Sequence, residues 1–347
     1  MRDRDYVELR CRSAFSFLDG ASLPEDLVAT AAAAGHHTLA LADVNGLYGA
    51  PRFFGAARRA GLRAIVGAEV TLGHAASGDQ PGSPPVLLLV ESRAGYQNLC
   101  RLLTRVHEGR PKGTGFATHA LLATHAGGLI ALAGAAPRED LATLRDAFGA
   151  GRLYLETQRH FDAAEAHRVR AVQAQAEAFR LPMVATNDVR YATPARRRIH
   201  DVLTCARHGV TVDEIGRRLS PSVEHHLKSP GEMAALFRDQ PAVLRATRAI
   251  AERCAFTLAD LGYAFPTFPA PDGQTEQGFL EAITWRGAAN RYRPVTDKVK
   301  RQLTRELDLI GRMQLAGYFL LVWDIVEFAR ANGIMVQGRG SAANSAV

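Results

Sequence analysis

The sequence predicts a mixed α/β protein in which most of the first 190 residues form a barrel of parallel strands. Strand-like and helix-like segments alternate from residue 6 to residue 188, and this alternation is typical of a parallel sheet. Acidic residues follow several of the predicted strands. The number of strand–helix units favours a closed barrel, and an open doubly wound sheet is the competing architecture. No G-x-G-x-x-G motif follows the first strand, which disfavours a dinucleotide-binding fold.

The elements of the barrel follow from short apolar runs and from helical stripes of apolar residues. A capping box formed by Ser22 and Glu25 introduces the first helix, and Gly35 ends it. The expected strands lie at residues 6–9, 38–42, 63–66, 86–90, 129–133, 152–156 and 183–186, and the helices that follow lie near 52–60, 94–107, 137–148 and 162–179.

The pattern becomes helical after about residue 193. Ser229 and Glu232 form a second capping box there. The stretch 264–273 is rich in proline and lacks periodicity, which predicts a linker. Two amphipathic helices follow it. The predicted regions are a barrel core at 1–200, its helical completion at 201–263, a linker at 264–274 and a final region at 275–347.

Composition narrows the class of protein. The formal net charge is +7, which suits a polyanionic partner. A GC-rich coding bias, which favours arginine over lysine, gives the same balance. No apolar run reaches the length that crosses a bilayer. The charged N-terminus lacks the apolar core of a signal peptide. The four cysteines are far apart, which disfavours a zinc cluster or a disulfide framework. We therefore expect a cytoplasmic protein with no membrane partner.

Four acidic residues lie at the expected carboxyl ends of strands: Asp43, Glu69, Glu156 and Asp188. Such positions converge on one rim of a parallel barrel. Converging carboxylates can hold divalent metal ions for phosphoester hydrolysis. The alternative is that they cap helices or pair with arginines. Two histidine pairs, at 36–37 and 225–226, lack an acid or a third histidine at ligand spacing, so we interpret them as structural.

The C-terminal segment contains the sequence Gly338-Arg339-Gly340-Ser341. A loop of small residues can point several backbone N–H groups at one anion, and such a nest binds phosphate. Arg339 adds a fork-shaped cation and Ser341 a hydroxyl. The alternative is that the small residues permit tight packing of helices.

The barrel segments carry a resemblance to a known family. The stretches YVELRCRSAFSFLDGAS, LALADVNGLYG, RAIVGAEVTL, GYQNLCRLL, LYLETQRH and VATNDVRY resemble the successive motifs of the PHP domain that opens bacterial C-family DNA polymerases. The residues of the first motif resemble those of the error-prone, ImuC-type branch of these polymerases. The resemblance implies a distorted seven-stranded PHP barrel, which holds three metal ions in the active members of the family.

Several residues depart from the metal-binding pattern of that family. Glu8, Arg10 and Arg12 stand at the histidine positions of the first motif, Val44 at that of the second, and Arg190 at that of the last. A guanidinium stays charged and has no lone pair for a metal ion. The remaining motif positions are occupied by Asp43, Glu69, His160 and Asp188. We therefore expect a PHP domain that binds no metal, needs no cofactor and hydrolyses nothing.

The C-terminal stretch GYFLLVWDIVEFARANGIMVQGRGSAANSAV is similar to the beginning of the C-family polymerase palm. The resemblance implies that Gly338, Arg339, Gly340 and Ser341 contact the triphosphate of the incoming nucleotide. In that family the catalytic aspartates, which hold Mg²⁺, come after this loop. We therefore expect no catalytic residue in this chain and no polymerase activity from it alone. The complete enzyme would act on primer–template DNA and deoxynucleoside triphosphates in translesion synthesis and DNA repair, alongside other translesion proteins and the sliding clamp.

Two other functions stay open from the sequence. One is an active, metal-dependent PHP phosphoesterase or 3′–5′ exonuclease, which requires bound metal. The other is a non-enzymatic module that docks partner proteins.

Overall fold

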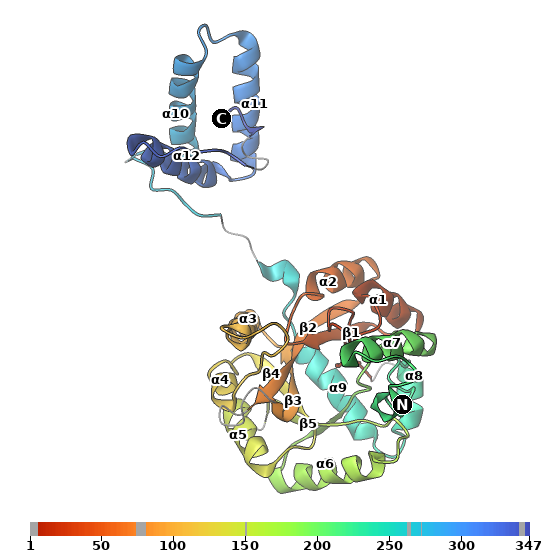
Figure 1. The fold of residues 1–347 in the computed structure, drawn as a ribbon. Helices are drawn as coiled ribbons and strands as arrows, with labels where there is room; N and C mark the ends of the chain where they lie inside the picture. The colour runs from red at the N-terminus through yellow and green to blue at the C-terminus, as the bar shows by residue number, and fades with distance from the viewer. Residues whose placement is uncertain (1–5, 74–80, 150, 262–264, 272, 340–343) are drawn as a thin grey trace. The chain divides into compact units, whose positions relative to one another are not determined.

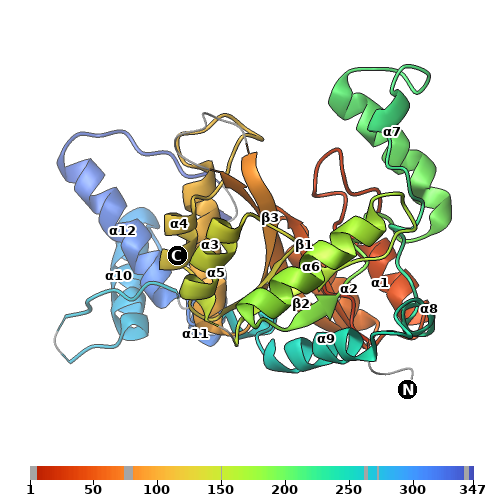
Figure 2. The same cartoon turned by 90° about the horizontal axis from the view of Figure 1, so that it is seen from below.

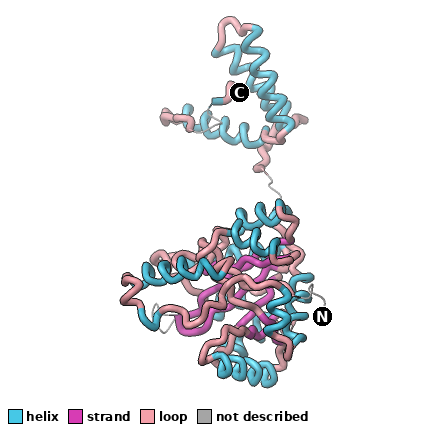
Figure 3. Tube along the Cα trace, turned by 90° about the vertical axis from the view of Figure 1, so that its right-hand side faces the viewer, coloured by secondary structure: helices cyan, strands magenta, loops and turns pink. Residues whose placement is uncertain are grey.

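The structure is a computed structural model, which describes residues 6–73, 81–149, 151–261, 265–271, 273–339 and 344–347 of the chain. The chain forms two compact units, one ending at Leu261 and one beginning at Gly262. Unit 1 contains all the described strands, and unit 2 contains helices and loops (Figure 3).

Unit 1 is built from a curled sheet of six strands with helices on its outer side (Figures 1 and 2). The mixed α/β class predicted from the sequence is confirmed. In chain order the elements are α1 (Pro24–Ala33), β1 (Thr38–Val44), α2 (Ala50–Arg59), β2 (Arg63–Gly73), β3 (Pro81–Val90), α3 (Arg93–His107), α4 (His119–Thr124), β4 (Leu129–Ala133), α5 (Arg138–Phe148), β5 (Leu153–Thr157), α6 (Glu165–Phe179), β6 (Met183–Ala185), α7 (Arg197–His208), α8 (Pro230–Leu236) and α9 (Pro241–Arg253), with short 3₁₀ turns at Pro194–Arg196, Gly216–Arg218 and Leu258–Leu261.

The prediction of an all-parallel sheet was wrong for one strand. β3 runs antiparallel to both β2 and β4, whereas β1–β2, β4–β5 and β5–β6 are parallel pairs. Only residues 74–80 separate β2 from β3, and a parallel crossover needs a dozen residues or more. A connection of that length leaves antiparallel pairing as the available arrangement.

The N-terminal segment lies between the two edges of the six-stranded sheet. Glu8 bridges Leu39 of β1, and Cys11 bridges Val189, just after β6. Arg12 N donates to Val189 O at 2.8 Å, and Ala42 N donates to Cys11 O at 2.8 Å. The expected strand at residues 6–9 is thus irregular, but the segment takes the position of a seventh strand.

The interior of the curled sheet is filled by small and branched apolar residues, among them Leu9, Ala40, Ile65 and Leu89. Ile250 of helix α9 and Cys254, the residue after the helix, belong to the same cluster, at the end where Arg63 begins β2. The Arg63 guanidinium donates there to the carbonyl oxygens of Ala251 and Cys254. One end of the barrel is therefore covered, and the polar residues gather at the opposite end.

The two predicted capping boxes have different outcomes. Ser229 and Glu232 cap α8 as predicted: the Ser229 side chain accepts from Glu232 N, and the Glu232 side chain accepts from Ser229 N. The first prediction was wrong, since α1 begins at Pro24 and Leu23 precedes it. The Ser22 hydroxyl instead accepts a hydrogen bond from Ala192 N at 2.9 Å.

Unit 2 comprises α10 (Glu276–Arg291), α11 (Asp297–Arg312) and α12 (Ala316–Ala331). Its core is a small apolar cluster to which all three helices contribute, including Leu280, Leu307 and Leu320. Among the described residues, no single helix is long and apolar enough to cross a membrane; only α11 and α12 taken together, bent by 118° at their junction, pass that test.

Candidate functional site: a buried arginine–carboxylate network

Strand geometry brings three of the predicted acids together inside the open end of the barrel. Successive side chains of a strand alternate between its faces, so Glu69 shares the inner face of β2 with Ile65. Glu69 lies within β2, and the prediction that it follows the strand was wrong, because β2 extends to Gly73. Glu156 is in β5 and Asp188 follows β6. All three acids are buried.

Arg10 occupies the space between two of these carboxylates. Its side chain is 5% exposed. Its Nε donates to Glu156 Oε1 at 2.8 Å, and Nη2 lies 2.7 Å from Glu156 Oε2. Its Nη1 donates to Glu69 Oε2. The two-pronged contact with Glu156 matches the fork of the guanidinium to the plane of the carboxylate.

Arg12 extends the network from Glu69 to the loop above the barrel. Its Nη2 donates to Glu69 Oε2 at 2.8 Å and lies 3.1 Å from Asp188 Oδ1. Its Nη1 donates to Asp19 Oδ2 at 2.8 Å. Burial alone would raise the pKa of Asp188, but the Arg12 and Arg190 guanidiniums outweigh it and hold that pKa well below its usual range.

Asp43 lies at the same rim, but hydroxyl and amide groups surround it. Its carboxylate accepts from Ser13 N at 2.7 Å, from Ser13 Oγ at 2.9 Å and from Ser16 Oγ at 2.7 Å. Burial raises the pKa of Asp43, and these hydrogen bonds oppose the rise. Val44, at a predicted ligand position, follows Asp43 at the end of β1.

Glu8 is committed to the local backbone. It accepts from Arg10 N at 2.9 Å, from Asn187 N at 3.0 Å and from the Tyr6 hydroxyl. Burial raises its pKa to about 7, although these hydrogen bonds lower it. The Glu8 carboxylate therefore holds the N-terminal segment beside the end of β6.

Two histidines line the other side of Asp188. The rings of His160 and His225 lie 4.0 Å apart between centroids. His160 Nε2 donates to Asn187 O at 3.0 Å, and His225 Nδ1 lies 3.4 Å from Asp188 Oδ2. The fold brings Asp188 to His225 from 37 residues away, a contact that the spacing of residues in the sequence does not show.

These residues do not fit a metal cluster of the PHP type. A divalent ion needs carboxylate or imidazole lone pairs that converge on one point. Here the oxygens of Glu69, Glu156 and Asp188 converge on two guanidiniums, which repel a cation. Across the part of the chain that the structure describes, no group of three or more His, Cys, Asp or Glu side chains is arranged to hold a metal ion.

Asp19 is a partner of this network that the sequence did not predict. Asp19 accepts from Arg12, and Arg190 and Arg207 lie 3.8 and 3.6 Å from its Oδ1. The only available signal was its position in the first motif stretch, shortly after Arg12. Its position depends on the loop that carries it, in which a Cβ atom at residue 20 would collide with the carbonyl group of Ser13, so only glycine fits there.

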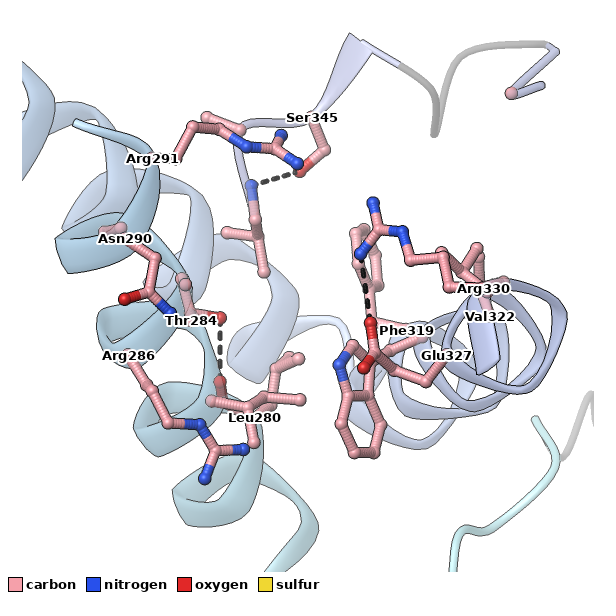
Figure 4. Close-up of a pocket in the computed structure, with 18 of the residues that line it drawn as sticks. Leu280, Thr284, Arg286, Asn290, Arg291, Phe319, Val322, Glu327, Arg330 and Ser345 are labelled. Carbon is pink, nitrogen blue, oxygen red and sulfur yellow. Dashed lines mark hydrogen bonds and ion pairs between the residues drawn. The ribbon is translucent and has the colours of Figure 1, made fainter. Parts of the chain in front are cut away.

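The structure describes two of the four residues that the sequence predicts to bind phosphate. Gly338 and Arg339 line a cavity of about 930 Å³ in unit 2, whereas Gly340 and Ser341 lie outside the described residues. Arg286 and Arg291 of α10 and Arg330 of α12 also line this cavity (Figure 4). Arg330 lies 3.0 Å from Glu327.

The pH dependence of stability should reveal the buried His160. Burial lowers its pKa to about 4, and His225 acts in the same direction, whereas an unfolded histidine has a pKa of about 6.5. Between these two pKa values the unfolded chain binds more protons than the folded chain. The contribution of the neutral His160 to the free energy of unfolding is therefore complete above pH 6.5 and is lost as the pH falls toward 4.

We therefore expect the stability advantage of the wild type over His160→Gln to shrink by up to about 3 kcal/mol from pH 7 to pH 4. Urea unfolding at several pH values measures this difference. His167→Gln, at an exposed position of α6, controls for the added amide. A difference that is the same at every pH would contradict a buried neutral imidazole.

Models of known protein families match parts of both units. Residues 8–160 match the model of the PHP domain, and residues 278–347 match the model of the bacterial DNA polymerase III alpha NTPase domain. The chain is 38% identical to an error-prone DNA polymerase of Anaeromyxobacter sp. strain K, across 99% of this chain and 37% of that protein. It is 39% identical to one of Mycolicibacterium paratuberculosis, across 99% and 33% respectively.

The chain thus spans about a third of the length of the curated relatives it matches. Among solved structures, it is similar to an amidohydrolase from Chromobacterium violaceum with a TM-score of 0.40 and 15% identity, across 53% of this chain and 87% of that one.

Proposed function

Because this chain is homologous over nearly its whole length to error-prone DNA polymerases, we propose that it forms the PHP domain and the first part of the palm of such an enzyme. The complete enzyme would extend primers past damaged template bases in the cytoplasm, using deoxynucleoside triphosphates. Bound Mg²⁺ would stabilise the developing charge of nucleotidyl transfer in that enzyme. In this chain, the tail around Arg339 would hold the triphosphate.

We propose further that the PHP domain is a scaffold and hydrolyses nothing. The observation that carries this is the position of Arg10 and Arg12, whose guanidiniums take up the carboxylate oxygens that a metal cluster would need. A metal ion generates the hydroxide nucleophile of such sites near neutral pH by lowering the pKa of its bound water, and a scaffold without the metal would lack that nucleophile. The barrel would then stabilise the polymerase body.

A hydrolysis assay tests this proposal. The purified chain is incubated with a 3′-labelled single strand or with p-nitrophenyl phosphate, with Mn²⁺ or Zn²⁺ added. We expect no release above that of a Glu69→Gln/Asp188→Asn variant, which removes two carboxylates from the site. Metal-dependent release that this variant abolishes would establish the alternative, an active PHP phosphoesterase.

A further inference from the structure

Helix α11 has two faces of opposite character. Leu303, Leu307 and Ile310 are buried in the core of unit 2. The exposed surface of the helix carries all five of its basic side chains, at Lys298, Lys300, Arg301, Arg305 and Arg312. At 1.5 Å per residue, this row of cations extends over about 21 Å.

The positive charge of this face is only weakly compensated. Lys300 lies 3.5 Å from Asp297, and among the described residues the other four cations form no ion pair. Glu306, an acid in the middle of the helix, points to the C-terminal tail, where it accepts from Ser345 Oγ at 2.6 Å and from Ala346 N at 2.7 Å. On the outer face only Asp297 and Asp308 oppose the five cations.

The face also has the shape and chemistry of a backbone-binding surface. A shallow groove of about 390 Å³ runs along it, lined by Lys300, Arg301, Thr304, Arg305, Asp308 and Arg312. Each lining residue is polar or charged, so the groove offers little to the apolar centre of a protein partner. Guanidinium and ammonium groups in a row suit a row of phosphates, which arginine can grip with two hydrogen bonds.

We propose that this outer face of α11, defined by Lys298, Lys300, Arg301, Arg305 and Arg312, binds the sugar–phosphate backbone of DNA. The proposal rests on the proposed polymerase function only in its choice of DNA as the polyanion. Phosphate contacts carry no information about the bases, so binding is independent of the DNA sequence. Because binding releases counterions from the DNA, the affinity falls steeply as the salt concentration rises.

The test compares two variants of equal charge. In the first, Lys298, Arg301, Arg305 and Arg312 are all changed to glutamine, which keeps helix propensity. In the control, the same change is made at Arg58, Arg101, Arg145 and Arg170, which are exposed on helices of unit 1. Both lower the net charge from +7 to +3. Fluorescence anisotropy measures the binding of labelled single-stranded and duplex oligonucleotides to the full chain from 50 to 200 mM KCl.

We expect the α11 variant to bind at least about tenfold more weakly at 100 mM KCl, and its slope of log K against log salt for duplex DNA to fall by up to about 3.6, at 0.9 for each lost phosphate contact. The affinity of the control variant for DNA should stay within about twofold of that of the wild type. The single-strand and duplex arms decide which form of DNA the face prefers.

Equal losses in the two variants would show a general effect of charge and overturn the proposal, as would an α11 variant that binds like the wild type. Absence of binding by the wild type at 50 mM KCl would also overturn it. None of these results bears on the metal-free PHP domain, which the hydrolysis assay tests separately. Thermal unfolding of the variants by circular dichroism checks that α11 is still folded.

Discussion

Replacing Arg10 with alanine is expected to lower the free energy of unfolding by about 3–5 kcal/mol. The change leaves Glu156 without its two-pronged partner and removes one of the two guanidiniums that contact Glu69. Both carboxylates are at most 5% exposed, so the variant leaves buried charges without their counter-charge, which is costly. Urea unfolding followed by circular dichroism measures the loss.

The matched control for Arg10→Ala is Arg52→Ala. Arg52 forms an ion pair of similar length with Glu25, at 2.7 Å, but its side chain is 49% exposed. Surface pairs of this kind contribute at most about 1 kcal/mol. Arg10→Lys keeps the charge but lacks the planar guanidinium, so its free energy of unfolding should lie between those of the wild type and Arg10→Ala. If Arg10→Ala cost no more than Arg52→Ala, the network would not stabilise the barrel.

Arg339→Ala should reduce kcat/KM for nucleotide incorporation by the complete enzyme by about 10- to 150-fold, the equivalent of one charged hydrogen bond of about 1.5–3 kcal/mol. The reason is that the proposed function places the guanidinium of Arg339 next to the triphosphate, where it would donate two hydrogen bonds. Steady-state primer extension on undamaged template, with the nucleotide concentration varied, measures the effect.

Arg330→Ala is the control for Arg339, because Arg330 lines the same cavity but already pairs with Glu327. It should change kcat/KM by less than about fivefold, as expected for an exposed pair worth at most about 1 kcal/mol. A variant at Arg339 with unchanged nucleotide dependence would remove this residue from the triphosphate site and leave the proposal resting on Gly338, Gly340 and Ser341 alone.

The elements that could be predicted from the sequence are those set by local pattern. Apolar runs located β1, β4 and β5 to within two residues at each end, and the Ser229 capping box located the start of α8. The direction of β3 was missed because strand direction depends on the length of the connection. The periodicity of β3 itself is the same in either direction.

The site was predictable where a residue type excludes a chemistry, and unpredictable where contacts are long-range. Arginine at positions 10 and 12 argued against metal ligation without any coordinates. The pairing of Arg10 with Glu156 spans 146 residues, and the meeting of His225 with Asp188 depends on a turn after β6. No local pattern encodes either contact, since both arise when the barrel closes.

We propose that guanidiniums take the place of metal ions at the open end of the barrel. The most direct test is the metal content of the purified chain after incubation with excess Mn²⁺ and Zn²⁺ and removal of the unbound ions, measured by inductively coupled plasma mass spectrometry. We predict far less than one ion per chain, and no difference between the wild type and Asp188→Ala. One or more ions per chain, lost in Asp188→Ala, would contradict it.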